Sequence, residues 1–152
     1  MAHWKIASVV LAALLAGCAS SPGMGKRAAS SDWIEPGQAV LGAAAAPREG
    51  VTGMFVMTVK ATGRADEMMY LNSEEDYRDP RNLSIEVTPD AAAQLERGFG
   101  AQPSGALKGK RILVSGTARR TRIDFFVGNR PTGKYYYQTH VRVEQASQIQ
   151  IL

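Results

Sequence analysis

The sequence predicts a mainly β domain: a five-stranded Greek-key barrel with one short helix between its third and fourth strands. Short alternations of apolar and polar residues recur after Gly50 and are broken by turn residues, a pattern typical of small sandwiches and barrels. Fifteen Gly and seven Pro favour turns and strands. A chain of 152 residues, 45% hydrophobic and 21% charged, is long enough for one compact domain with a tail.

Residues 1–17 have the features of a signal peptide. His3 and Lys5 precede an apolar run at residues 6–16. A run of this length is too short to cross a hydrocarbon core, which needs about 20 residues. Export would separate the protein from cytosolic ATP and NAD, and the sequence contains no Walker loop or dinucleotide fingerprint. We therefore expect an exported protein without a cofactor.

The apolar run ends in Leu15-Ala16-Gly17-Cys18, which resembles the bacterial lipobox. The resemblance implies that the Cys18 thiol receives a diacylglycerol before cleavage, so that acyl chains such as palmitate hold the protein in a membrane. Ala19 stands where an Asp would retain such proteins at the inner membrane of enteric bacteria, which implies the outer membrane, facing the periplasm. Cys18 is the single cysteine, so disulfide frameworks and zinc fingers are excluded.

Residues 18–50 are predicted to be the lipidated cysteine and a flexible linker, which leaves residues 51–152 as the domain. The segment is rich in Ala, Ser, Gly and Pro and has no sustained hydrophobic period. Trp33 and Ile34 are an exception. Either they dock on the domain or they stay exposed in the linker.

Three strands are predicted before the helix. The first covers residues 55–61 and is followed by a turn at 62–64, and the second is shorter, at residues 68–71. The third, at residues 83–87, alternates strictly between apolar and polar side chains and is the clearest strand signal in the chain. Residues 72–82 form a polar connection between the second and third strands.

One good helix candidate follows the third strand. Thr88 suits the N-cap, Pro89 the first helical position and Gly98 the C-cap. Leu95 and Phe99 fall on one face of this segment. We therefore expect the helix to cover the end of a core and not to stand alone.

Strand patterns resume at residues 111–118, 123–127, 135–143 and 149–152, with a turn at 129–133. Three strands, one helix and two long strands that are bent or broken is the element order of an OB-fold. A small β-sandwich with a helix in one crossover has the same elements and is the alternative.

Two segments resemble a bacterial OB-fold group. YLNSEEDYRDPRN at residues 70–82, before the strand at 83–87, is similar to that group's FLN…DY hairpin, and LKGKRILVSG at residues 107–116 is similar to its entry into strand four. Members occur alone or beside secreted nucleases and other exported domains. The resemblance implies an OB-fold from Gly50 onward and, from members that bind nucleic acid, a similar face here. This chain departs from the joined members because no catalytic domain accompanies the OB-fold.

No catalytic residue is predicted. After removal of residues 1–17, His140 is the only histidine, and no nucleophile-elbow motif accompanies it. His140 alternates with Tyr136, Gln138 and Arg142 on what we expect to be an outward face. We therefore interpret it as a surface or edge residue, and enzymes become the least favoured class.

No metal site is predicted either. The acidic residues between 74 and 79 lack the alternating spacing and central Gly of a calcium loop, so we interpret them as a solvated hairpin with Arg78 and Arg81 as partners. Met57 shares its strand parity with Phe55, so the nearby methionines are predicted to belong to the core and not to a copper site.

The C-terminal third is strongly basic. Residues 105–152 hold nine Lys and Arg against two acids, a net charge of +7, whereas residues 18–104 carry −4. Basic residues interleaved with aromatics are how an OB groove binds single strands. In the arrangement we favour, however, Tyr135 and Tyr137 point into the barrel and only Tyr136 lies outside. The basic face of an exported protein is then expected to meet lipopolysaccharide, phospholipid or an acidic protein.

The sequence thus predicts a non-enzymatic, membrane-anchored binding protein of the bacterial envelope. Its OB-fold groove would bind a protein or an anionic envelope ligand such as a glycolipid. The alternatives are a binding protein for single-stranded nucleic acid, or an assembly accessory that pairs through an exposed strand edge. The predicted ligand-binding residues are Tyr70, Asn72, Tyr77, Arg78, Arg119, Arg120, Arg122 and Tyr136.

Overall fold

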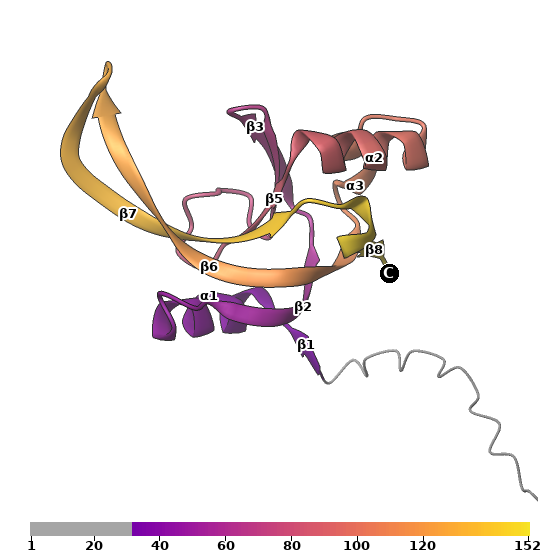
Figure 1. Ribbon diagram of the computed structural model, residues 1–152, viewed down its shortest axis with the longest axis horizontal. Helices are drawn as coiled ribbons and strands as arrows, with labels where there is room; N and C mark the ends of the chain where they lie inside the picture. Colours follow the sequence, from indigo (N-terminus) through magenta and orange to yellow (C-terminus); the bar gives the residue numbers. More distant parts are fainter. Residues whose placement is uncertain (1–31) are drawn as a thin grey trace, which may run out of the picture.

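The computed structural model describes residues 32–152. The predicted signal peptide, Cys18 and Ala19 lie outside the described residues. Within them, a mixed eight-stranded sheet carries a few helices (Figure 1). The elements are β1 (Trp33–Ile34), α1 (Pro36–Ala45), β2 (Val51–Thr58), β3 (Ala61–Ala65), β4 (Met68–Asn72), β5 (Leu83–Val87), α2 (Pro89–Phe99), α3 (Pro103–Leu107), β6 (Arg111–Val127), β7 (Arg130–Val143), the 3-10 turn η2 (Ala146–Gln148) and β8 (Ile149–Ile151).

The strands follow the order β1-β2-β6-β7-β5-β4-β3, and β8 pairs with β6. The pairs β1–β2 and β5–β7 are parallel, and the other pairs are antiparallel. Although β2 and β3 lie far apart in this order, only Val59 and Lys60 separate them in the chain. The Val59 N–H donates to the Lys110 carbonyl and the Lys60 N–H to the Asn72 carbonyl, each at 2.9 Å. This corner therefore links the start of β6 to the end of β4.

The hydrophobic core confirms the mainly β prediction. Phe55, Leu71, Ile85 and Val141 are fully buried between the strands. Met57 is 2% exposed, which confirms its predicted place in the core. The fully buried members of the core cluster all lie between residues 39 and 143. A chain that begins at residue 19 therefore keeps the whole core.

The helix between β5 and β6 begins as predicted. The Thr88 hydroxyl accepts a hydrogen bond from the Ala91 N–H at 3.3 Å, and Pro89 is the first helical residue. The predicted end is wrong, because α2 continues past Gly98 and terminates at Gly100, whose φ of 64° is accessible to glycine without strain. The prediction of a single helix is also wrong, since α3 follows before β6 begins.

Residues 33–45, which the sequence assigned to the linker, are folded. Trp33 and Ile34 dock as β1, opposite Met54 and Phe55 of β2. Helix α1 packs on β2 and β6 with two alanines, at positions 39 and 43, fully buried. Alanine at both positions lets the helix approach the sheet closely, although such a face carries a weak hydrophobic pattern. None of the helices in residues 32–152 is long and apolar enough to span a membrane.

Strands β6 and β7 extend beyond the rest of the sheet as a two-stranded hairpin (Figure 1). Strand β2 accompanies β6 only as far as Ala118, and β5 meets β7 only from Thr139 onward. Residues 119–138 therefore pair with neither β2 nor β5, and we call them the arm. At about 3.3 Å per residue, the arm extends roughly 30 Å. The patterns at 111–118 and 123–127, which the sequence assigned to a long strand that is bent or broken, form one continuous strand of 17 residues, β6, with a register shift between Asp124 and Phe126.

Candidate functional site

One face of the arm carries two stacked arginine–tyrosine pairs. The guanidinium carbon of Arg120 lies 3.6 Å from the centre of the Tyr137 ring, and that of Arg122 lies 4.2 Å from the centre of the Tyr135 ring. The two rings meet edge to face, with their centres 5.6 Å apart. We call these four residues the Arg–Tyr ladder. Cation–π contacts at exposed sites contribute about 0.5–1 kcal/mol each, so the four side chains hold one another in place.

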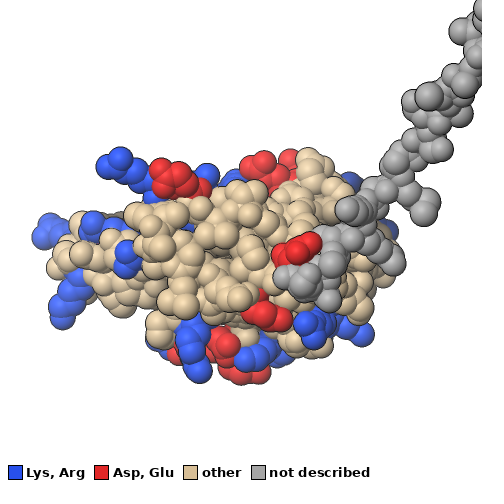
Figure 2. Space-filling view, turned by 90° about the horizontal axis from the view of Figure 1, so that it is seen from below, with Lys and Arg blue, Asp and Glu red and all other residues tan. Residues whose placement is uncertain are grey.

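The ladder is positively charged. Arg122 donates from Nε and Nη2 to Asp124 Oδ1 at 3.0 and 2.7 Å, and this hydrogen bonding raises the pKa of Arg122. Within residues 32–152, the Arg120 side chain has its ring contact but no hydrogen bond or ion pair. The arm holds five basic residues and one acid, a net charge of +4. Figure 2 shows blue side chains at the end of the molecule where the arm lies.

The favoured inward orientation of Tyr135 and Tyr137 is wrong, because these side chains are 50% and 40% exposed. Their parity was correct, since they share a face of β7 with the buried Val141. The core, however, ends near Thr139, where β5 stops pairing with β7. Beyond that point the same face of the strand faces solvent.

The opposite face of the arm is tied to the connection between β4 and β5. The Tyr136 ring lies 5.3 Å from that of Phe125, and its hydroxyl accepts a hydrogen bond from Gln138 Nε2 at 2.8 Å. The same amide nitrogen donates to the Tyr77 carbonyl at 3.3 Å. Burial is the main cause that raises the pKa of Tyr136. This face is thus held by internal contacts, whereas the ladder face is open.

The polar connection at residues 73–82 carries Tyr77 and Arg78. Tyr77 is 52% exposed, and the Arg78 guanidinium carbon lies 5.5 Å from the centre of its ring. Arg78 binds Asp76 and Arg81 binds Asp79, which confirms the predicted local pairs. Hydrogen bonding to Arg81 lowers the pKa of Asp79 to about 2. Within residues 32–152 no cluster of three His, Cys, Asp or Glu side chains is arranged to hold a metal ion.

Asn72 is not available to a ligand, contrary to the prediction. Its side chain is buried, and its Oδ1 accepts hydrogen bonds from Asn82 Nδ2 at 3.2 Å and Ser84 Oγ at 2.8 Å. Asn82 also donates to the Tyr77 carbonyl and accepts from the Glu74 N–H. Asn72 and Asn82 therefore support the connection at residues 73–82 from its buried side.

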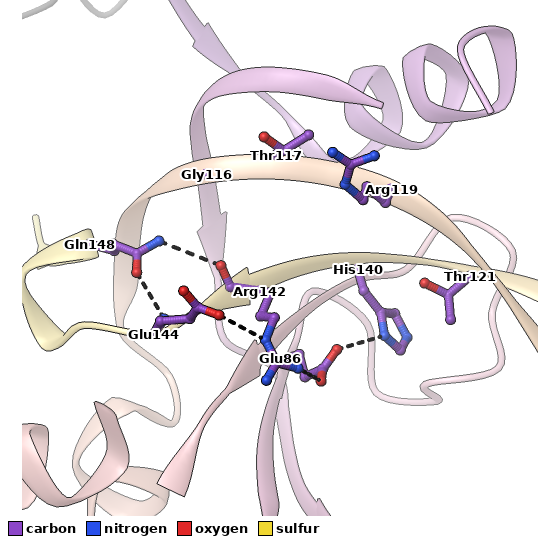
Figure 3. A pocket seen from close by; sticks show the side chains of 9 residues that line it. All are labelled: Glu86, Gly116, Thr117, Arg119, Thr121, His140, Arg142, Glu144 and Gln148. Atoms are coloured by element: carbon purple, nitrogen blue, oxygen red, sulfur yellow. Dashed lines mark hydrogen bonds and ion pairs between the residues drawn. The ribbon is translucent and has the colours of Figure 1, made fainter. Parts of the chain in front are cut away.

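A polar hollow of about 430 Å³ lies on the outer surface of β5, β6 and β7 (Figure 3). Its charges are paired, since Arg142 bonds to Glu86 at 2.8 Å and to Glu144 at 3.3 Å. Arg119 lines this hollow and donates to the Arg48 carbonyl at 2.8 Å. It therefore lies on the face opposite the ladder, although it is next to Arg120 in the sequence.

His140 lies beside this hollow and is buried, so its interpretation as a surface or edge residue is wrong. Its Nε2 is 2.7 Å from Gln138 Oε1, and its Nδ1 is 3.5 Å from Glu86 Oε2. Because the Gln138 amide oxygen accepts, Nε2 carries the proton in the neutral ring. Tyr70 packs edge-on against His140, with ring centres 5.9 Å apart, and burial is the main cause that raises the pKa of Tyr70.

The burial of His140 predicts a pH dependence of stability. Burial lowers its pKa below the ordinary 6.5, and Glu86 only partly opposes the effect. The unfolded chain then binds this proton more readily than the folded one, so stability falls as the pH drops through about 6.5 toward the folded pKa. We expect the His140 ring resonances to titrate below 6.5, and His140→Gln to lose less thermal stability than wild type between about pH 7.5 and 5.5. A folded pKa above 6.5 would contradict this prediction.

The predicted ligand-binding residues do not form one groove. They separate into the ladder (Arg120, Arg122), the opposite face of the arm (Tyr136), the connection (Tyr77, Arg78), its buried support (Asn72) and the surroundings of His140 (Tyr70, Arg119). The sequence did not predict that Tyr135 and Tyr137, the two tyrosines of the ladder, are exposed. Arg120 and Arg122 share the strand parity of Ala118, and this was the available signal that the face leaves the core.

A distant structural likeness to a solved structure is found. No family model matches the chain, and no curated protein matches it. The chain is similar to a solved structure described as a putative aspartyl-tRNA synthetase from Leishmania major Friedlin, with a TM-score of 0.41 and 9% identity over 87% of this chain and 23% of that one. The chain thus spans about a quarter of that protein's length. A likeness of this degree carries no weight for function.

Proposed function

We propose that this protein is a non-enzymatic binding module of the bacterial envelope that recognises an anionic ligand through the Arg–Tyr ladder. A lipid on Cys18 would hold it at the outer membrane, facing the periplasm. The main support is the stacking of Arg120 on Tyr137 and of Arg122 on Tyr135 on an open face with a single acid.

We also propose that the domain is an OB-fold barrel. Strands β2 and β3 are then two halves of one bent first strand, which pairs with β6 through one half and with β4 through the other. The parallel pair of β5 and β7 and the helices between β5 and β6 agree with the OB order. In this order the arm is the hairpin between the fourth and fifth strands, one of the places where OB-folds bind their ligands.

The ladder would bind by recognition without chemistry. A guanidinium stacked on a ring keeps its in-plane N–H groups free, and these fit phosphate or carboxylate oxygens two at a time. The tyrosine support also reduces the side-chain freedom that each arginine loses on binding. Arg120 is the first donor in this scheme, because Asp124 already engages Arg122.

The test uses the chain from residue 19 to 152, labelled with ¹⁵N, and dihexanoyl phosphatidylglycerol below its micelle concentration. We expect localised amide shifts at the ladder and at least tenfold weaker binding in Arg120→Gln/Arg122→Gln, with the melting temperature lowered by only a few degrees, because each lost ring contact contributes about 0.5–1 kcal/mol. Arg64→Gln/Arg97→Gln is the matched control, because it removes two exposed arginines outside the arm. Equal affinity in the two double variants would contradict the proposal.

A second candidate function is the binding of single-stranded nucleic acid. It is favoured by the half-exposed rings of Tyr135 and Tyr137 beside arginines, since such rings stack on bases while the cations follow phosphates. A short oligonucleotide titrated at low and at physiological salt tests it. Ladder shifts that survive physiological salt would support this candidate, and shifts that vanish would leave only a basic surface.

A further inference from the structure

The end of the arm is apolar. Phe125, Phe126 and Val127 are consecutive and are 48%, 60% and 74% exposed. Within residues 32–152, five of the nine exposed large hydrophobic side chains lie on the arm. Exposed apolar groups that gather in this way mark surfaces that meet a partner or a membrane.

The backbone of this tip has a defined geometry. The Thr132 hydroxyl donates to the Phe125 carbonyl at 2.9 Å and accepts from the Lys134 N–H at 3.3 Å. Gly128 and Gly133 have φ values of 59° and 80°, a region that glycine occupies without strain. The three apolar side chains are therefore held at the end of the arm, where Phe125 contacts the Tyr136 ring and still leaves about half of its surface exposed.

Basic side chains flank the apolar tip. Arg130 pairs with Val127 beside the turn, at the very end of the arm, whereas Lys134 precedes Tyr135, which is opposite Asp124. Three residues of strand span about 10 Å, so Val127 and Tyr135 are separated by roughly the depth to which interfacial segments enter a bilayer. Lys134 and Tyr135 would then lie at the level of the headgroups, where tyrosines are enriched.

We propose that the tip of the arm inserts into the surface of an anionic phospholipid bilayer. Phe125, Phe126 and Val127 would enter among the acyl chains, Lys134 would meet the headgroup phosphates, and Arg130 would reach back to them along its aliphatic stem. The net charge of +4 on the arm complements such a surface. The end of a two-stranded hairpin is also too narrow for a protein interface, which buries about 800 Å² per partner. This inference rests on the proposed function only in that the ladder would face the same headgroups.

The experiment uses residues 19–152, which carry no acyl chain, so any vesicle binding comes from the described domain or from the residues just before it. Vesicles of phosphatidylglycerol and phosphatidylcholine in equal parts are compared with vesicles of phosphatidylcholine alone by co-sedimentation. We expect at least tenfold tighter binding to the anionic vesicles, and a loss of at least tenfold in Phe125→Ser/Phe126→Ser. Leu41→Ser/Leu152→Ser is the matched control, since it removes two exposed apolar side chains away from the arm.

A second readout reports insertion directly. Phe126→Trp places a fluorophore at the tip, and we expect a blue shift with anionic vesicles and quenching by brominated acyl chains. Unchanged binding of the serine double variant, or a tryptophan that stays in water, would overturn the inference. Self-association that depends on Phe125 and Phe126, without vesicle binding, would also overturn it, because the tip would then join two copies of the chain.

The experiments distinguish ligand binding by the ladder from membrane insertion of the tip. If the serine double variant keeps its ladder shifts with soluble phosphatidylglycerol but loses vesicle binding, both proposals are supported. If those ladder shifts are absent in the wild type while vesicle binding still depends on the tip, the insertion stands and the proposed function fails. If Arg120→Gln/Arg122→Gln abolishes vesicle binding and the tip variant does not, lipid is bound by charge alone and the insertion is wrong.

Discussion

Phe55→Ala is expected to lower the free energy of unfolding by about 3–5 kcal/mol, as for other buried aromatics that leave a cavity. Phe55 is fully buried at the centre of β2, between Ile34 of β1 and Val114 of β6 in the strand register. The cavity would therefore weaken the packing of β2 against β1 and β6. Equilibrium denaturation of the chain from residue 19 to 152 measures it.

Phe126→Ala is the matched control for this prediction, because it removes the same side chain where it is 60% exposed. Its free energy of unfolding is expected to stay within about 0.5 kcal/mol of wild type. A loss below about 1 kcal/mol in Phe55→Ala, or equal losses in the two variants, would contradict the position of Phe55 in the core.

Asn82→Ala is expected to cost about 2–4 kcal/mol, the second largest effect. The Asn82 amide nitrogen donates to Asn72 Oδ1, the Tyr77 carbonyl and Ser84 Oγ at 2.9–3.3 Å, and its oxygen accepts from the Glu74 N–H at 3.0 Å. Its removal leaves buried polar groups without partners, and each such group costs about 1–3 kcal/mol. Thermal and chemical denaturation measure the loss.

The same variant has a local readout. Because Asn82 holds the Tyr77 carbonyl and the Glu74 N–H, we expect faster amide hydrogen exchange across residues 73–82 than across β6. Asn129→Ala, in the exposed turn of the arm, is the control and is expected to change neither measurement. Unchanged exchange in the connection would show that Asn82 does not hold it.

The arm is unusual because it keeps strand pairing where no core supports it. A two-stranded hairpin is marginally stable alone in water. Here stacked side chains cover both faces of the hairpin, with Arg120 on Tyr137 and Arg122 on Tyr135 on one side and Phe125 on Tyr136 on the other. The groups that we propose for binding therefore also stabilise the arm. We chose Gln for the arginine variants because its aliphatic stem keeps part of this packing.

The sequence by itself determined the features that depend on close neighbours along the chain. Strand alternation at residues 83–87 predicts β5, and Thr88 with Pro89 predicts the start of α2. The pairs of Arg78 with Asp76 and of Arg81 with Asp79 also followed from local spacing. In each case the interacting groups lie within a few residues of one another, so their chemistry is already visible in the sequence.

Only the tertiary structure decided which faces of these elements are covered. The parity of Tyr135 and Tyr137 was correct, but their exposure depends on where β5 begins, more than fifty residues away in the sequence. His140 shares a face with exposed residues and is buried beside Glu86 and Tyr70. Helix α1 has an alanine face that becomes a packing surface only against β2 and β6. Alternation along one strand defines its two faces, whereas burial depends on strands and helices that distant parts of the chain supply.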